Sequence, residues 1–359
     1  MASFSEANHR LLILPSKEDS FRIYELDSPH SSPTLCPYPI PSKQFETSSI
    51  SVVACCESYL LIGYGFTELE GLILFNPTTR IYRALPKVYV AIDADYVHYG
   101  MCHCLDDEFN DDFKIVRLVQ YDREHKVREV MVYSLSTNSW KSIELKQTRS
   151  QWIGYPVLIQ NHLLVMIFYD GYLYGRFTRI GCFDIKAERW SNDVLLSDIL
   201  LGEIDFNFTQ PYQGVLYHLG VLERQLRFSC YDMNKLSYSI WVMKEYGVKE
   251  SWVKLMSVSG KSLVDVRHPI AYRQGSSNQL LCIPKYSWFN LRDKQFIEMG
   301  FDGEGLNSYR YSFAYVCKAS LLNFPGGKPI HSSSKKPDDD DNEDEEEANI
   351  FLRLSQNSI

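Results

Sequence analysis

The sequence predicts an all-β fold, and three observations lead to that prediction. Aromatic residues make up 14% of the chain, with 24 Tyr and 19 Phe, and these residue types favour strands over helices. Short apolar runs alternate with polar turns, and no sustained helical period interrupts them. A pair of aromatic residues at one fixed spacing recurs along the chain, each time around a polar turn.

The recurring aromatic pair predicts a hairpin. Four pairs share the same spacing: Phe75 with Tyr82, Tyr133 with Trp140, Phe183 with Trp190, and Phe289 with Phe296. A constant spacing across a turn indicates one hairpin geometry that is used four times. The stretch "SIWVMKEYGVKESWVKL" fits as a variant in which Trp241 and Trp252 take the same positions around a longer turn. Tyr231 and Tyr238 have the same spacing but lie out of phase, and we interpret that match as a coincidence.

The repeat also predicts the architecture. The first aromatic residue of each hairpin recurs roughly every 50 residues, which is typical of kelch-like β-propeller blades with several short strands each. Apolar runs at 11–26 and 308–324 lie outside the five complete repeats. Pairing them would close the ring and remove its open edges. We therefore expect a kelch-like propeller of six blades, with seven as the alternative, closed by pairing N- and C-terminal strands.

Three segments follow from this architecture. Residues 1–9 form an N-terminal lead, residues 10–324 the propeller, and residues 325–359 a disordered acidic tail, because like charges repel and few apolar side chains remain there. The run "DDDDNEDEEE" at 338–347 supplies nine acids, and without them the net charge of −8 would become +1. A near-neutral folded part argues against nucleic acid as a partner.

The nine Cys are odd in number and irregularly spaced. The N-terminus has no signal-peptide pattern, and no apolar run is long enough to cross a membrane. We expect free thiols, a cytoplasmic or nuclear location, and no membrane partner.

Four segments together resemble one known family. They are "LILFNPTTRIYRALP" at 72–86, "DDFKIVRLV" at 111–119, "EVMVYSLSTNSWKSIE" at 129–144 and "IWVMKEYGVKESWVKL" at 240–255. In this order they are similar to the motifs of plant F-box-associated domains, which include S-locus F-box relatives. The resemblance implies a propeller that binds target proteins as the substrate receptor of an SCF (cullin-RING) ubiquitin ligase.

The sequence departs from the family pattern at two places. An F-box module, which in the family docks on a Skp-type adaptor and a cullin, is not recognisable before residue 10, so the resemblance implies those partners only if an F-box is supplied. The family often has a Gly-aromatic-Gly-aromatic-Asp segment where this chain has Cys102-His103-Cys104-Leu105-Asp106. Cys is small enough to stand where Gly packs closely.

Residues that could carry chemistry are sparse. In "CHC", Cys102 and Cys104 would share one face of a strand and His103 the other, which favours core thiols over a metal site. No nucleophile-elbow or zinc-protease motif occurs. We expect no catalytic residue, no metal and no cofactor. A non-ligase kelch-like scaffold and a propeller hydrolase remain alternatives to the binding module.

Recognition is expected where the repeats differ, in loops on one face of the ring. The longest connections between repeats are 87–100 and 147–155, and Tyr and Trp are frequent in binding hot spots. We therefore expect protein recognition by Tyr89, Asp95, Tyr96, His98 and Trp152. The aromatic pairs themselves recur in every repeat, so we interpret them as core that fills the gaps between blades.

Overall fold

A computed structural model describes most of the chain. The described residues are 9–14, 20–25, 34–39, 50–64, 71–88, 96–105, 111–121, 126–144, 151–152, 157–160, 162–169, 176–191, 194–197, 215–232, 235–259, 268–273, 276–283, 287–298, 313–318, 320–321 and 324–330. The chain divides into a compact unit, Met1–Lys328, and a second unit, Pro329–Ile359, of which only residues 329 and 330 are described. The predicted acidic tail beyond residue 330, like the lead before residue 9, lies outside the described residues.

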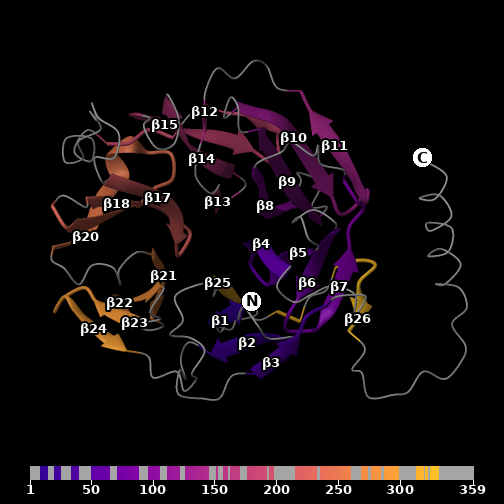
Figure 1. The fold of residues 1–359 in the computed structure, drawn as a ribbon, viewed down its shortest axis with the longest axis horizontal. Coiled ribbons are helices and arrows are strands. Elements are labelled where there is room, and N and C mark those ends of the chain that lie inside the picture. The colour runs from indigo at the N-terminus through magenta and orange to yellow at the C-terminus, as the bar shows by residue number, and fades with distance from the viewer. Residues whose placement is uncertain are drawn as a thin grey trace, which may run out of the picture. The chain divides into compact units, whose positions relative to one another are not determined.

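The described strands form six antiparallel sheets, which we name A to F (Figure 1). Four of them consist of strands that are consecutive in sequence, whereas sheets A and B each combine strands from the N-terminal part with one strand from the C-terminal part. The only helical element among the described residues is one short 3-10 turn, Lys249–Ser251. The prediction of an all-β propeller is therefore confirmed.

The bounds of the strands are as follows. Sheet A has the order β25 (Phe313–Lys318), β1 (His9–Leu14), β2 (Ser20–Glu25), β3 (Thr34–Pro37). Sheet B has the order β4 (Ile50–Cys56), β5 (Tyr59–Tyr64), β6 (Gly71–Asn76), β7 (Ile81–Ala84), β26 (Lys328–Pro329). Sheet C consists of β8 (Tyr96–Leu105), β9 (Asp111–Tyr121), β10 (Lys126–Ser134), β11 (Ser139–Ile143).

The remaining three sheets contain the strands from residue 151 to residue 298. Sheet D consists of β12 (Gln151–Trp152), β13 (Val157–Ile159), β14 (His162–Tyr169), β15 (Arg176–Asp184), β16 (Arg189–Trp190). Sheet E consists of β17 (Val215–Leu222), β18 (Gln225–Asp232), β19 (Ser237–Met243), β20 (Trp252–Ser259). Sheet F consists of β21 (His268–Arg273), β22 (Ser276–Ile283), β23 (Ser287–Asn290), β24 (Gln295–Glu298).

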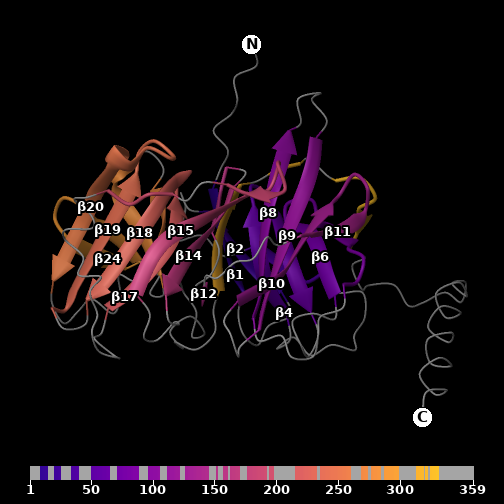
Figure 2. The same cartoon turned by 90° about the horizontal axis from the view of Figure 1, so that it is seen from above.

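Within the unit Met1–Lys328 the sheets follow one another around a ring (Figure 1), which Figure 2 shows from its edge. One inner strand of each sheet contacts an inner strand of the next, in the cycle β25, β4, β8, β13, β17, β21 and back to β25. The cycle closes through β25, which contacts both β21 and β4. Within sheet A, β1 pairs antiparallel with β25, which places Leu11 opposite Val316 and Leu12 opposite Tyr315. The N- and C-terminal strands therefore pair as the sequence predicts.

The aromatic pairs occupy the outer hairpins of four sheets. In each hairpin the two aromatic residues are direct cross-strand partners: Phe75 with Tyr82, Tyr133 with Trp140, Phe183 with Trp190, and Phe289 with Phe296. The rings pack against the preceding sheet, so that Tyr133 and Trp140 join the core between sheets B and C, and Phe289 joins that between E and F. This contact with the preceding sheet explains why aromatic residues recur at these positions.

One turn geometry serves these hairpins. The residue after the first aromatic caps the turn with its side chain, as when Asn76 Oδ1 accepts hydrogen bonds from the amides of Thr78 and Thr79. The last turn residue has a positive φ in every case: Arg80 (58°), Asn138 (51°), Glu188 (52°) and Lys294 (55°). A residue with left-handed backbone at the end of the turn gives the chain the twist that the two strands of a hairpin need. The recurring spacing of the aromatic residues therefore reflects a recurring backbone geometry.

The same geometry also occurs at a place where the sequence interpretation was wrong. Tyr231 and Tyr238 are direct cross-strand partners in the β18–β19 hairpin, Asp232 Oδ1 caps its turn by accepting from the Lys235 amide, and Leu236 has φ 46°. The match is therefore no coincidence. It lies out of phase because it joins the second and third strands of its sheet, whereas the other four hairpins join the last two.

The tryptophan pair of sheet E needs a second correction. Trp241 lies opposite Lys254 and Trp252 opposite Met243, with a bulge between Ile240 and Trp241. The enlarged turn between β19 and β20 and this bulge shift the register, so the two tryptophans do not share the cross-strand position of Phe75 and Tyr82. Gly247 supplies a φ of 84° within the turn, a conformation that a regular α-helix does not contain.

Two predicted boundaries also move. The connection 87–100 is shorter than expected because β8 begins at Tyr96. At the other end, the ordered chain continues beyond residue 324: Phe324 is buried against sheet B, and Arg83 donates a hydrogen bond to the Pro325 carbonyl at 2.7 Å. The sequence missed both because burial and pairing partners, rather than turn residues, define these ends.

Candidate functional site

The predicted recognition residues divide into described and undescribed ones. Tyr89 and Asp95 lie outside the described residues. Tyr96 is the first residue of β8 and Trp152 the last of β12, and nothing is described of their side chains. His98 lies inside β8 and is half-buried, so it belongs to a strand and not to a connecting loop.

Backbone register places Tyr96 and Trp152 at corresponding ends of neighbouring sheets. Tyr96 pairs with Gln120, near the end of β9 that lies away from the β8–β9 turn. Trp152 pairs with Ile167, near the end of β14 that lies away from His162. Both ends lie away from the turns of the aromatic hairpins, because alternate turns of an antiparallel meander fall on opposite faces. We name this side the connection face and the opposite side the hairpin face.

His98 is poorly suited to surface recognition by charge. Burial lowers the pKa of its imidazole to about 4, so the ring is neutral at physiological pH. Its cross-strand partner is the buried Leu118. We therefore regard His98 as part of the support beneath the connection face.

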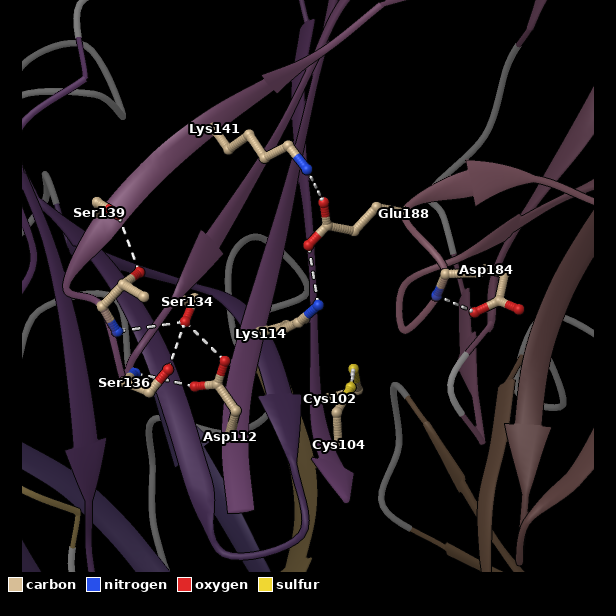
Figure 3. A network of polar contacts seen from close by, with 12 residues as sticks. Cys102, Cys104, Asp112, Lys114, Ser134, Ser136, Ser139, Lys141, Asp184 and Glu188 are labelled. Carbon is tan, nitrogen blue, oxygen red and sulfur yellow. Dashed lines mark hydrogen bonds and ion pairs between the residues drawn. The ribbon is translucent and has the colours of Figure 1, made fainter. Parts of the chain in front are cut away.

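The clearest polar site among the described residues lies on the hairpin face, between sheets C and D (Figure 3). Glu188, the left-handed residue of the β15–β16 turn, accepts hydrogen bonds from Lys114 on β9 at 2.9 Å and from Lys141 on β11 at 2.6 Å. One carboxylate of sheet D thus ties two strands of sheet C. We call Lys114, Lys141 and Glu188 the Glu188 junction.

Charge stabilises this junction. Burial would raise the pKa of Glu188, but hydrogen bonds from Lys141 and Lys114 outweigh that effect and lower it. Burial would lower the pKa of Lys114, and its bond to Glu188 reverses the direction and raises it. The carboxylate and the ammonium group both stay ionised at neutral pH. The lowered pKa makes Glu188 a weaker base than a free carboxylate, and protonated Lys114 has no lone pair for nucleophilic attack.

Asp112 braces the neighbouring β10–β11 turn (Figure 3). Its Oδ2 accepts from the Ser134 hydroxyl at 2.6 Å, and its Oδ1 accepts from the Ser136 amide at 2.9 Å. Asp112 and Lys114 lie on the same side of β9, two residues apart. The strand therefore contributes both to the turn of its own sheet and to the ion pair with the next sheet.

Two thiols lie directly opposite these residues. Cys102 and Cys104 on β8 are buried, their sulfur atoms are 3.0 Å apart, and in the register Cys102 faces Lys114 while Cys104 faces Asp112. The predicted core thiols are confirmed, and His103 lies on the other face, stacked on Phe113 at 4.7 Å between ring centroids. Among the described residues no group of three His, Cys, Asp or Glu side chains could hold a metal ion.

The motif at 239–255 provides a second joint, between sheets D and E. The indole of Trp252 donates to the Leu195 carbonyl at 3.0 Å, and Trp252 packs in the core shared by the two sheets. Tyr246, in the enlarged turn, stacks on His162 with 5.3 Å between centroids and touches the Cys182 sulfur through its hydroxyl at 3.6 Å. The motif is therefore a clamp between sheets and not a catalytic segment.

Sequence reasoning missed the Glu188 junction. In the segment "FDIKAERW" the aromatic residues carry the repeat, and Glu188 stands among other charged residues in a polar turn. The spacing of the hairpin does mark the position of Glu188 in the turn, where every hairpin of this type has a residue with left-handed backbone. Nothing in the spacing indicates that its partners lie on the preceding sheet.

Fold and site together define a class of protein: a β-propeller whose described polar clusters join neighbouring sheets. Residues 17–286 match the F-box associated beta propeller domain, and the chain belongs to this family. No helix among the described residues has the length and apolar character needed to span a membrane.

The chain is also similar to three curated proteins of Arabidopsis thaliana. It is 31% identical to F-box protein CPR1 over 66% of this chain and 60% of that protein, and 29% identical to F-box protein At4g22390 over 83% and 75%. It is 26% identical to F-box/kelch-repeat protein At3g23880 over 62% and 56%. The chain thus spans less than two thirds of the length of the first and third of these relatives.

Proposed function

We propose that this chain is a protein-binding module that recognises targets for an SCF-type ubiquitin ligase and that is itself not catalytic. Membership of the F-box associated beta propeller family carries the proposal, supported by relatives whose names describe F-box proteins. The polar clusters agree with it, because Glu188, Lys114 and Asp112 are engaged in joining strands. The adaptor and cullin enter only through an F-box, supplied by a longer chain or by fusion.

The finer architecture belongs to the same proposal. The six described sheets and the closed cycle of inner strands favour a six-bladed ring of kelch-like size, spanning residues 10–324 and the short segment after it. A ring of this kind offers two faces with different turns. We assign target recognition to the connection face, where Tyr96 and Trp152 lie near the ends of their strands with His98 beneath. Tyr89 and Asp95, which lie outside the described residues, are included only because they precede β8 in the sequence. A cytoplasmic or nuclear location is proposed with it.

The experiment is proximity labelling in plant cells with the full chain, alone and fused to an F-box. We expect the same target proteins in both samples, and the Skp-type adaptor and cullin only with the fusion. Direct adaptor binding by residues 1–359 alone would contradict the stated dependence on an F-box. An interactome free of ubiquitin machinery even with the fusion would favour a kelch-like scaffold, and hydrolysis of a glycan would favour an enzyme.

Point variants test the assigned face once a target is captured. Tyr96→Ala and Trp152→Ala should each weaken target binding by about tenfold or more, the effect of removing an aromatic hot spot. Arg292→Ala is the matched control, because Arg292 is exposed in a turn of the hairpin face and contributes only its backbone amide to the turn. Loss of binding in the control with normal binding by the other two would move recognition to the hairpin face.

A further inference from the structure

We propose that Cys102 and Cys104 form a reversible dithiol–disulfide pair whose redox state controls the strength of the joint between sheets C and D. Their sulfur atoms are 3.0 Å apart, on neighbouring same-face positions of one strand. Both thiols are buried, with 1% and 4% of their surface exposed. All nine cysteines are free thiols in this structure.

Strand geometry allows this bridge but strains it. Two residues of a strand span roughly 6.6 Å between Cα atoms, because each residue advances the chain by about 3.3 Å. That separation is near the upper limit of about 6.8 Å seen for disulfides. A bridge here would shorten β8 locally. Strained disulfides are reduced more readily than relaxed ones, which suits a reversible pair and not a permanent structural bond.

The electrostatic surroundings favour one of the two thiols as the nucleophile. The contact between the two sulfur atoms raises the pKa of Cys102 and lowers that of Cys104, and the Lys114 ammonium lowers the pKa of Cys104 further. Cys104 therefore supplies the thiolate.

The oxidant is a peroxide. Cys104 attacks one peroxide oxygen, the O–O bond breaks, and Cys104 becomes a sulfenic acid as the other oxygen leaves as hydroxide or water. The Cys102 sulfur then attacks the Cys104 sulfur and forms the S–S bond. The sulfenic oxygen leaves as water with the proton of Cys102. Two thiols and one hydrogen peroxide give one disulfide and two waters.

The register links this chemistry to the joint. Cys102 lies opposite Lys114, which holds Glu188 of sheet D, and Cys104 lies opposite Asp112, which accepts the Ser136 amide. If β8 shortens between Cys102 and Cys104, these two residues shift relative to Lys114 and Asp112, their cross-strand partners on β9. Oxidation should therefore loosen the β10–β11 turn and the contact with Glu188, and reduction should restore them.

Peptide mapping of the full chain tests whether the bridge forms. After graded hydrogen peroxide, free thiols are alkylated without reduction and the chain is cut at Lys and Arg. The fragment 88–114 contains Cys102 and Cys104 and no other cysteine, while fragment 44–80 contains Cys55 and Cys56. The second fragment is a matched control, because adjacent strand residues point to opposite faces and bridge poorly. We expect fragment 88–114 to lose the mass of two hydrogens and to escape alkylation at a lower peroxide concentration than the control fragment. Dithiothreitol should restore both the mass and the alkylation.

Hydrogen exchange of the same samples tests the consequence. The Ser136 amide should exchange about tenfold faster in the oxidised chain, the factor for losing one hydrogen bond to a charged acceptor. Cys102→Ser and Cys104→Ser should each abolish this response, with far-UV circular dichroism confirming that they fold; Cys102→Ala replaces Cys102→Ser if it does not. Three results would each overturn the proposal. Fragment 88–114 could remain fully alkylated after peroxide, or Cys104 could be oxidised directly to the sulfinic acid. Alternatively, the bridge could form without changing the exchange rate of the Ser136 amide.

Discussion

The indole nitrogen of Trp252 in sheet E donates a hydrogen bond to the backbone carbonyl of Leu195, in the segment that leaves sheet D, at 3.0 Å. Trp140 of sheet C makes the same kind of bond to the Pro86 carbonyl, which follows β7 of sheet B, at 3.1 Å. In both cases the second aromatic residue of an outer hairpin fastens its sheet to the exit of the preceding one. The aromatic repeat thus combines packing with a directed bond.

Replacing Trp252 by Phe should lower the free energy of unfolding by about 1–2 kcal/mol, because it removes this bond and part of a buried ring. Urea unfolding followed by far-UV circular dichroism measures the change. Val253→Ala is the control, since Val253 is the next residue and 47% exposed, and should stay within about 0.5 kcal/mol of the parent. Equal effects of the two substitutions would mean that the Leu195 bond contributes nothing.

Glu188→Gln should destabilise the chain by on the order of 1 kcal/mol at pH 7, a modest value because Lys141 is largely exposed. The pKa of Glu188 in the folded chain lies below its ordinary value of 4.5, so its ionised form stabilises the fold above that value. This stability is lost as the pH falls from 4.5 through the lowered pKa. The difference between parent and variant should therefore be constant from pH 7 to about 5 and shrink below about 4.

Urea unfolding of both chains across this pH range provides the measurement for Glu188. Glu250→Gln is the control, because Glu250 is exposed and should change stability by less than about 0.5 kcal/mol at every pH. A gap between parent and Glu188→Gln that persists unchanged well below pH 4 would show that the ion pairs are not its cause.

Asn76→Ala should cost about 2–4 kcal/mol, more than the same change at Asn290. Both side chains cap the same type of turn through Oδ1. Asn76 is fully buried, and its Nδ2 also donates to the Ser320 carbonyl at 3.1 Å, so the substitution removes a buried amide and a long-range bond together with the cap. Asn290→Ala removes a half-exposed cap and should cost about 1 kcal/mol. Thermal unfolding of the two variants side by side decides whether the long-range bond carries the difference.

Leu236→Gly should raise the free energy of unfolding by about 0.5–1 kcal/mol. Leu236 has φ 46° and is 37% exposed, and a left-handed conformation is unfavourable for a residue with a side chain but not for glycine. Leu236→Ala keeps the unfavourable conformation and serves as the control, with little expected change. A destabilised Leu236→Gly chain in urea unfolding would mean that the leucine side chain packs usefully despite its backbone.

The outer hairpins could be predicted from the sequence alone because their determinants are local. The spacing of Phe75 and Tyr82, a capping side chain at Asn76 and a polar turn all lie within eight residues, and they specify the pairing that the structure has. The same local signal is present at Tyr231 and Tyr238, which pair directly although they lie out of phase with the repeat. Strand β8 was missed in part since it is buried along much of its length and shows little alternation.

The sequence by itself determined the repeat, the all-β class and the family, because each rests on short motifs in a fixed order. Only the tertiary structure decided which side chains of different sheets meet. Glu188 reaches Lys114 across 74 residues and Trp252 reaches Leu195 across 57. Such contacts depend on how neighbouring sheets twist and pack in the ring, and no periodic pattern in the chain encodes them. The same holds for the "CHC" segment, whose thiols become a candidate switch only because β9 places Asp112 and Lys114 opposite them.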